Sequence, residues 1–140
     1  MSGLKYLLDT NVLSETRKRE PRQSVVAFLE GTEPSALYLS VLTIGELRKG
    51  ILLKMISDRE AANRIASWLD GLEMSFADRT IGIDAATARV WGELSGQRPR
   101  PVIDTLFAAT ALVHEMTLVT RNEKDVSDIA GLKVLNPWAA

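Results

Sequence analysis

The sequence contains no cysteine and only one histidine among its 140 residues. Without cysteine the chain can form no disulfide, no thiolate zinc site and no thiol nucleophile, although this absence does not identify a compartment. No apolar run approaches the length of a membrane-spanning helix. The amino terminus reaches Asp9 after a very short apolar run, which is unlike a secretory signal peptide. We therefore expect a soluble, cytoplasmic protein without membrane association.

A strong charge of one sign is also absent, because 17 basic residues are balanced by 18 acidic ones. No global electric field draws such a chain to nucleic acid or to a membrane, so a polyanionic partner would have to be bound locally. The hydrophobic content of 46% is sufficient for a buried core, and 140 residues are typical of one domain. We expect residues 1–140 to form a single domain.

The most informative segment runs from Leu4 to Asn11. It is an apolar stretch of strand length that ends in an acid and two small polar residues. This pattern is typical of a buried strand that delivers Asp9 to the rim of a sheet. Three later acids, Glu46, Asp104 and Asp125, each stand near the predicted start of a helix that adjoins a strand.

Strand-like and helix-like segments alternate along the rest of the chain. Strands are predicted at 37–41, within 76–83, at 117–120 and at 132–135. Helices are predicted at 11–15 (a single turn), at 21–30, from Thr43 onward, at 58–72, at 85–94 with Asp84 as N-cap, at 102–114 with Pro101 as first helical residue, and at 123–129. The helix at 102–114 is apolar on nearly every side and should be largely buried. The alternation favours an α/β domain with a mainly parallel sheet.

Parallel strands joined by right-handed crossovers bring strand ends and helix starts to one edge of the sheet. Asp9 follows the first strand, and Glu46 lies in the first turn of the helix after the second strand. Asp104 lies in the first turn of the helix before the strand at 117–120, and Asp125 follows that strand. We therefore expect the four carboxylates to meet at the carboxyl edge of the sheet.

Carboxylates gathered without a counter-charge raise one another's pKa, and a divalent cation removes that cost. Oxygen ligands without cysteine favour a hard ion, so Mg²⁺ or Mn²⁺ is expected rather than Zn²⁺. Such ions retain water and bind phosphate oxygens, which makes phosphodiester hydrolysis the natural chemistry. The sequence offers no evident protein nucleophile.

Each acid also has a simpler structural explanation. Thr43 and Glu46 have the spacing of a capping box. Asp104 is favoured near a helix start by the helix dipole. Asp9 and Asp125 could belong to ordinary turns or caps. Capping is commoner than metal binding for any single acid, but capping alone does not account for four acids at one sheet edge.

Several basic residues could contact the phosphates of a nucleic-acid substrate around the acidic centre. Arg48 and Arg121 are the best placed, because they lie near Glu46 and Asn122 in the sequence. The run from Arg17 to Arg19 is more typical of a solvated face.

Four blocks of the chain, taken in order, resemble the PIN-domain ribonucleases, specifically the FitB-like toxins of VapBC-type toxin–antitoxin pairs. The blocks are LLDTNVLSE, SVLTIGELRKG, PVIDTLFAATAL and LVTRNEKDV, followed by a closing VLNPW. The resemblance covers nearly the whole chain. It implies a PIN-like α/β/α sandwich, a Mg²⁺- or Mn²⁺-dependent endoribonuclease that cuts tRNA, rRNA or mRNA, a homodimer, and inhibition by a cognate VapB-type antitoxin that occupies the active-site groove.

The resemblance also implies which residues form the site. By motif, the catalytic and metal-binding acids of the family fall on Asp9, Glu46, Asp104 and Asp125. The supporting polar positions fall on Asn11, Ser40, Thr120 and Asn122. Val126 stands where the family usually has an aromatic residue after its fourth acid, and Asn122 is an alternative for part of the Asp125 role.

Other functional classes remain as alternatives. A signalling receiver domain is also an α/β chain with acids at a sheet edge, but it needs two acids after the first strand and a lysine after a late one. Here only Asp9 follows the first strand, and Arg121 follows the late strand. An aspartate-nucleophile phosphatase is disfavoured because Asn11 occupies the place of its second acid. A catalytically silent RNA- or protein-binding domain of the same fold is the third alternative.

Overall fold

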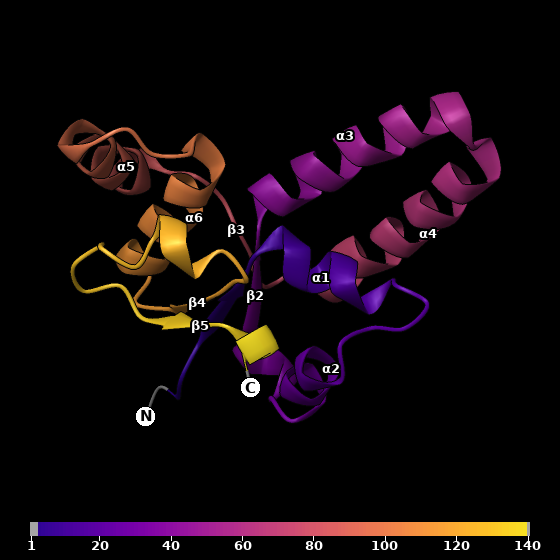
Figure 1. Ribbon diagram of the computed structural model, residues 1–140, viewed down its shortest axis with the longest axis horizontal. Helices are drawn as coiled ribbons and strands as arrows, with labels where there is room; N and C mark the ends of the chain where they lie inside the picture. Colours follow the sequence, from indigo (N-terminus) through magenta and orange to yellow (C-terminus); the bar gives the residue numbers. More distant parts are fainter. Residues whose placement is uncertain (1–2, 140) are drawn as a thin grey trace.

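The computed structural model describes residues 3–139, in which a five-stranded sheet carries helices on both faces (Figure 1). The strands lie in the order β3-β2-β1-β4-β5, and each neighbouring pair runs parallel. The predicted first strand is therefore the central one. The strands are β1 (Tyr6–Leu8), β2 (Leu37–Ser40), β3 (Thr80–Ile81), β4 (Thr117–Val119) and β5 (Val134–Leu135).

Helices connect these strands and agree with the predicted alternation. The α-helices are α1 (Thr10–Thr16), α2 (Gln23–Glu30), α3 (Val41–Ser57), α4 (Arg59–Ser75), α5 (Ala85–Gln97) and α6 (Val102–Val113). Single 3₁₀ turns are formed by η1 (Pro34–Ala36), η2 (Glu123–Asp125) and η3 (Pro137–Ala139). Among residues 3–139, no helix is both long and apolar enough to cross a membrane.

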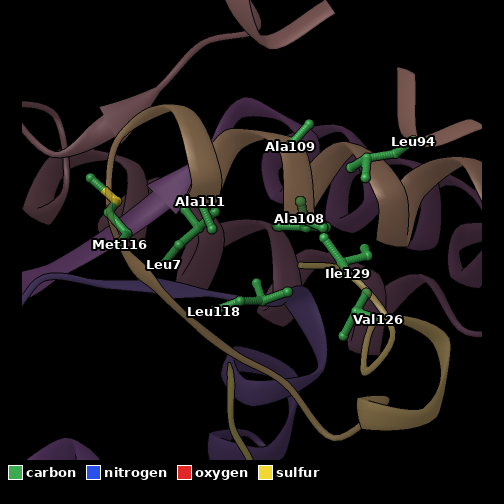
Figure 2. Packing of buried hydrophobic residues seen from close by; sticks show 10 residues of the cluster. Leu7, Leu94, Ala108, Ala109, Ala111, Met116, Leu118, Val126 and Ile129 are labelled. Carbon is green, nitrogen blue, oxygen red and sulfur yellow. The ribbon is translucent and has the colours of Figure 1, made fainter. Parts of the chain in front are cut away.

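The central strands are buried on both faces, and consecutive residues pack into different cores. Leu7 and Leu118 join the cluster covered by α5 and α6, part of which Figure 2 shows. Leu8 and Val119 join the second cluster, which is covered by α1, α2 and the C-terminal turn. Side chains alternate across a strand, so an unbroken apolar run fills two cores at once. This explains the apolar character of the segment before Asp9.

Small side chains allow α6 to lie close against the sheet. Ala108, Ala109 and Ala111 are fully buried, and Phe107 fills the space beside them. The predicted burial of this helix is confirmed. Its start differs slightly from the prediction, because Pro101 is the N-cap and Val102 is the first helical residue. Close packing of α6 fixes Asp104, which lies in its first turn.

Helices α3 and α4 form an antiparallel pair that extends away from the sheet (Figure 1). The pair has its own small core, made by Ile51, Ala62 and Leu69. Its outer end carries apolar side chains in solvent, among them Leu52 and Ile56. The pair is thus a separate layer beside the two cores of the sheet.

Two of the predicted helix boundaries that were wrong affect the predicted acids. The helix predicted from Thr43 begins at Val41, because Ser40 Oγ accepts a 3.0 Å hydrogen bond from the Leu42 amide and caps it. Glu46 consequently lies in the second turn. The helix predicted at 123–129 is a 3₁₀ turn that ends at Asp125, and the chain then continues in successive three-residue turns. Side chains three residues apart then share one face, which buries Val126 and Ile129 together.

Candidate functional site

Asp9 and Thr120 lie side by side at the carboxyl ends of β1 and β4. The Asp9 amide donates to the Val119 carbonyl oxygen at 2.9 Å, which extends the sheet ladder by one residue. The Thr120 hydroxyl donates to Asp9 Oδ2 at 2.6 Å, and both side chains are buried. The strand pairing therefore places an acid and its hydrogen-bond donor at the predicted sheet edge.

Burial is the main cause of a raised pKa at Asp9, and the Glu46 charge raises it further. The Thr120 hydroxyl opposes this effect, as do the nearby amides of Thr10 and Asn11. Although Asp9 is the N-cap residue of α1, its carboxylate makes no capping hydrogen bond within residues 3–139. Capping thus does not explain Asp9.

All three of the other predicted acids affect the pKa of Asp104. Its pKa is raised to about 6, mainly by burial and then by the Asp9 charge. Hydrogen bonding with the Asp125 carboxyl and the charges of Asp125 and Glu46 add to the increase. Carboxylates influence one another in this way only when they are close and lack a counter-charge. Asp104 is therefore the residue at which the four acids meet electrostatically.

Glu46 is joined to the start of α1 rather than to its own helix. The Thr10 hydroxyl donates to Glu46 Oε1 at 2.6 Å and lies 3.0 Å from the Thr43 hydroxyl. The capping-box explanation for Thr43 and Glu46 was wrong, because Ser40 caps this helix. The contact of Thr10 with Glu46 and Thr43 was not predicted, and its only signal in the sequence was the position of Thr10 directly after Asp9.

The supporting polar residues have distinct surroundings. Ser40 is fully buried at the start of α3. The Thr120 hydroxyl, besides donating to Asp9, accepts a 3.1 Å hydrogen bond from the Asn122 amide. Asn122 makes no side-chain cap to η2 among the described residues, so the capping explanation for that segment was wrong as well. The Asn11 Oδ1 atom is buried and has no hydrogen-bond partner in residues 3–139.

The acids share one electrostatic environment without forming a closed ligand set. Within the described residues, no three acidic or histidine side chains are arranged so that they could hold a metal ion together. Glu46 and Asp125 border separate surface hollows of about 420 and 380 Å³.

The two arginines predicted to contact RNA are in different situations. Arg48 forms ion pairs of 2.6 Å with both Asp70 and Glu73 of α4, so its charge is already neutralised. The Arg121 guanidinium lies over the Trp138 ring, 5.4 Å from the centroid, and lines the hollow beside Asp125. Arg121 remains available to an anion at the site.

Comparison with curated proteins gives relatives that match nearly end to end. The chain is 35% identical to the plasmid stability protein StbB of Pseudomonas syringae, covering 96% of this chain and 99% of the relative. It is 33% identical to the VapC ribonuclease Y4jK of Sinorhizobium fredii, covering 94% and 96%. It is 32% identical to the toxin FitB of Neisseria gonorrhoeae, covering 94% and 97%.

Solved structures share the fold described above. The crystal structure of FitAcB from Neisseria gonorrhoeae matches with a TM-score of 0.86 and 30% identity, covering 96% of this chain and 99% of that chain. A toxin–antitoxin complex from Klebsiella pneumoniae matches with a TM-score of 0.67 and 25% identity, covering 95% and 98%. The family model of the PIN domain matches residues 6–132. The receiver-like alternative is therefore wrong, and the chain belongs to the PIN-domain family.

Proposed function

We propose that this chain is a metal-dependent endoribonuclease and the toxin of a type II toxin–antitoxin pair. Its PIN domain and its similarity to a VapC ribonuclease and to toxin FitB support the activity. The observation that carries the proposal is the raised pKa of Asp104, which is due to burial and to the Asp9, Asp125 and Glu46 carboxyl groups. Such an uncompensated acidic cluster favours binding of a cation.

The donor atoms fit Mg²⁺ or Mn²⁺. Asp9, Glu46, Asp104 and Asp125 offer carboxylate oxygens, and Asn11 adds a buried Oδ1 that has no partner among the described residues. Hard divalent ions prefer oxygen ligands and retain water, so a few ligands from the protein are sufficient. We assign Asp9 and Asp104 as the principal ligands, with Glu46 and Asp125 completing the set.

Hydrogen bonds from threonine hydroxyl groups orient two of the acids. Thr120 fixes the Asp9 carboxylate by its hydrogen bond, and Thr10 does the same for Glu46. A bound ion would polarise the scissile phosphate and activate a water for in-line attack. Close packing of α6 against the sheet fixes the position of its first turn, which carries Asp104, and this would reduce the reorganisation that metal binding requires.

Cationic side chains beside the acids would bind the RNA backbone. Arg121 and Lys124 line the hollow next to Asp125, and Lys49 lines the hollow next to Glu46. Phosphate contacts of this kind position RNA without reading its sequence. The substrate that we propose is therefore RNA (tRNA, rRNA or mRNA), whose backbone would follow the edge of the sheet.

We also propose that the chain forms a homodimer and is inhibited by a VapB-type antitoxin. Structures of FitAcB and of a toxin–antitoxin complex resemble this chain along almost its full length. An inhibitor that excludes RNA must satisfy the acids it covers, and an arginine of the antitoxin is suited to do so. Replacing that arginine should weaken inhibition, and unchanged inhibition would refute the contact.

A cleavage assay tests the proposed activity. Purified protein is incubated with tRNA, rRNA and mRNA in the presence of Mg²⁺, Mn²⁺ or EDTA, beside Asp9→Asn and Asp104→Asn. Asp78→Asn is the matched control, since Asp78 precedes β3 at the opposite edge and is exposed. We expect metal-dependent cleavage that both site variants abolish and the control retains. Cleavage that survives EDTA and both substitutions would reject the mechanism, and metal binding without cleavage would favour the silent-domain alternative.

A further inference from the structure

One carboxylate outside the proposed ligand set is unusually well bonded. Asp128 accepts hydrogen bonds from Arg98 Nε at 2.9 Å and Arg98 Nη2 at 3.0 Å. It also accepts bonds from Arg100 Nη1 at 3.0 Å and Nη2 at 3.2 Å. Each oxygen of Asp128 thus receives two N–H groups, one from each guanidinium. The proposed mechanism does not use any of these three residues.

The arginines belong to the segment that leads into α6. Arg98 and Arg100 lie between α5 and α6, and Asp104 follows in the first turn of α6. Arg100 is anchored further, because its Nε donates to the Leu94 carbonyl oxygen at 2.8 Å and its side chain is 2% exposed. The guanidinium groups are therefore fixed relative to the end of α5 and the start of α6.

The carboxylate belongs to the segment that carries Asp125. Asp128 follows Asp125 by three residues, after the 3₁₀ turn η2. Val126 and Ile129 hold this segment against α6, and Figure 2 shows them beside Ala108. Apolar contacts of this kind resist separation but have little directional preference. A paired guanidinium–carboxylate contact is directional, so it also fixes the rotation and register of the segment.

The connection acts on two acids that repel one another. Asp104 and Asp125 are close enough to act on one another, and two carboxylates at such close range repel one another unless a cation is bound between them. Asp128 and, to a smaller extent, Asp125 raise the pKa of Arg98, so Asp125 also lies within the field of that guanidinium. The arginine pair thus opposes the tendency of the Asp125 segment to move away from α6.

We propose that Asp128, held by Arg98 and Arg100, is a positioning residue that sets the separation of Asp104 and Asp125 for metal binding. The inference rests on the proposed function, because it assumes that these two acids act on one ion. Groups that orient metal ligands commonly change metal affinity about 10–100-fold when they are removed. Asp128 itself contacts neither the ion nor RNA.

Direct metal binding tests the proposal without RNA. Mn²⁺ affinity of the full chain is measured by calorimetry for wild type, Asp128→Asn, Asp128→Glu and the ion-pair control Asp78→Asn. We expect the Mn²⁺ Kd to rise about tenfold in Asp128→Asn, to be partly restored in Asp128→Glu, and to be unchanged in the control. At saturating metal, the KM for RNA should be unchanged in Asp128→Asn, since the effect is on the ion.

The outcomes separate this inference from the proposed function. A folded Asp128→Asn protein with wild-type Mn²⁺ affinity overturns the positioning role, even if RNA is cut normally. If the wild-type protein cuts no RNA but Asp128→Asn still weakens Mn²⁺ binding, the positioning role is supported and the proposed activity is overturned. If Asp128→Asn does not fold, the same measurement on Arg98→Gln decides, because Arg98 is partly exposed and its loss is milder. Wild-type affinity in that variant also overturns the proposal.

Discussion

The Thr120 hydroxyl donates a 2.6 Å hydrogen bond to Asp9 Oδ2, although the two residues are 111 positions apart in the chain. Thr120→Val removes this donor and should raise the Asp9 pKa further, because Thr120 lowers it. Leaving the buried carboxylate without its donor should cost about 1–3 kcal/mol of unfolding free energy. Thermal denaturation near pH 7 measures the loss, and Thr120→Ser, which keeps the hydroxyl, serves as the control. Equal stability of Thr120→Val and wild type would contradict the prediction.

Asp104 predicts how the stability of the metal-free protein varies with pH. Its pKa is about 6 in the folded protein against an ordinary value of 3.8, so the folded state keeps a proton that the unfolded chain has released. Between these values the unfolding free energy should fall as pH rises, and it should stay low above them. Asp104→Asn should then stabilise the metal-free protein at pH 7.5 by on the order of 1–2 kcal/mol.

Chemical denaturation at several pH values, with EDTA present, checks the Asp104 prediction. The stabilisation by Asp104→Asn should shrink as pH falls below the ordinary aspartate range, where wild type is protonated in both states. At neutral pH, Mg²⁺ should make wild type more stable than Asp104→Asn, because the Asp104 carboxylate is then a ligand of the bound ion. A variant that is less stable than wild type at every pH, with or without metal, would contradict it.

Glu15 should show the opposite pH dependence. It pairs with Lys18 at 2.8 Å and accepts one hydrogen bond from the Arg22 amide at 2.8 Å, and these contacts lower its pKa. A lowered pKa contributes stability above the ordinary glutamate range, and this contribution is lost as pH falls through the folded value. Glu15→Gln should thus lower the Tm near pH 7, and the difference from wild type should narrow on acidification. Melting curves from pH 3 to pH 8 measure this, and a difference that is constant with pH would rule out the charge as its source.

The Thr10–Glu46 contact predicts a loss of activity without a loss of fold. Thr10→Val removes the hydroxyl that holds Glu46 Oε1 while keeping a similar side-chain volume. If Glu46 completes the metal site, Mg²⁺-dependent cleavage should fall about tenfold or more. Thr10→Ser should retain most of the activity. Wild-type rates and Mg²⁺ dependence in Thr10→Val would show that this orientation is not used.

Arg121 and Arg48 should differ in their effect on RNA binding. Arg121 lines the hollow beside Asp125, whereas Arg48 is paired with Asp70 and Glu73. Arg121→Gln should raise the KM for RNA. It should also reduce the slope of log KM against log salt concentration by roughly one, which corresponds to the loss of one phosphate contact. Arg48→Gln should leave both unchanged and cost at most about 1 kcal/mol of stability. Equal effects of the two substitutions would mean that Arg48 leaves its partners to bind RNA.

The placement of the acids could be predicted because it depends on local pattern and on a general rule of parallel sheets. The apolar segment before Asp9 is a central strand, and the small residues of α6 identify a buried helix that carries Asp104. Both follow from residues that are adjacent or at helical spacing. The rule that strand ends and helix starts share one edge then brings Asp9 near Asp104.

Contacts that depend on how two helices align could not be predicted in this way. Arg48 forms an ion pair with Asp70 because α3 and α4 pack in one particular register. Nothing in the sequence near either residue specifies that register. The Thr10–Glu46 contact depends on where α1 crosses α3, and the serine cap at Ser40 shifted the start of that helix by two residues. Side-chain roles at such crossings are set by tertiary packing rather than by sequence pattern.

The strand order has a consequence for synthesis on the ribosome. β1 lies in the middle of the sheet, so its second neighbour, β4, is translated more than a hundred residues later. Until then one side of the first strand has no partner, and pairing across such a distance makes folding slower. The acidic site of a nascent chain is therefore incomplete until β4 has emerged, since only then does Asp9 meet Thr120.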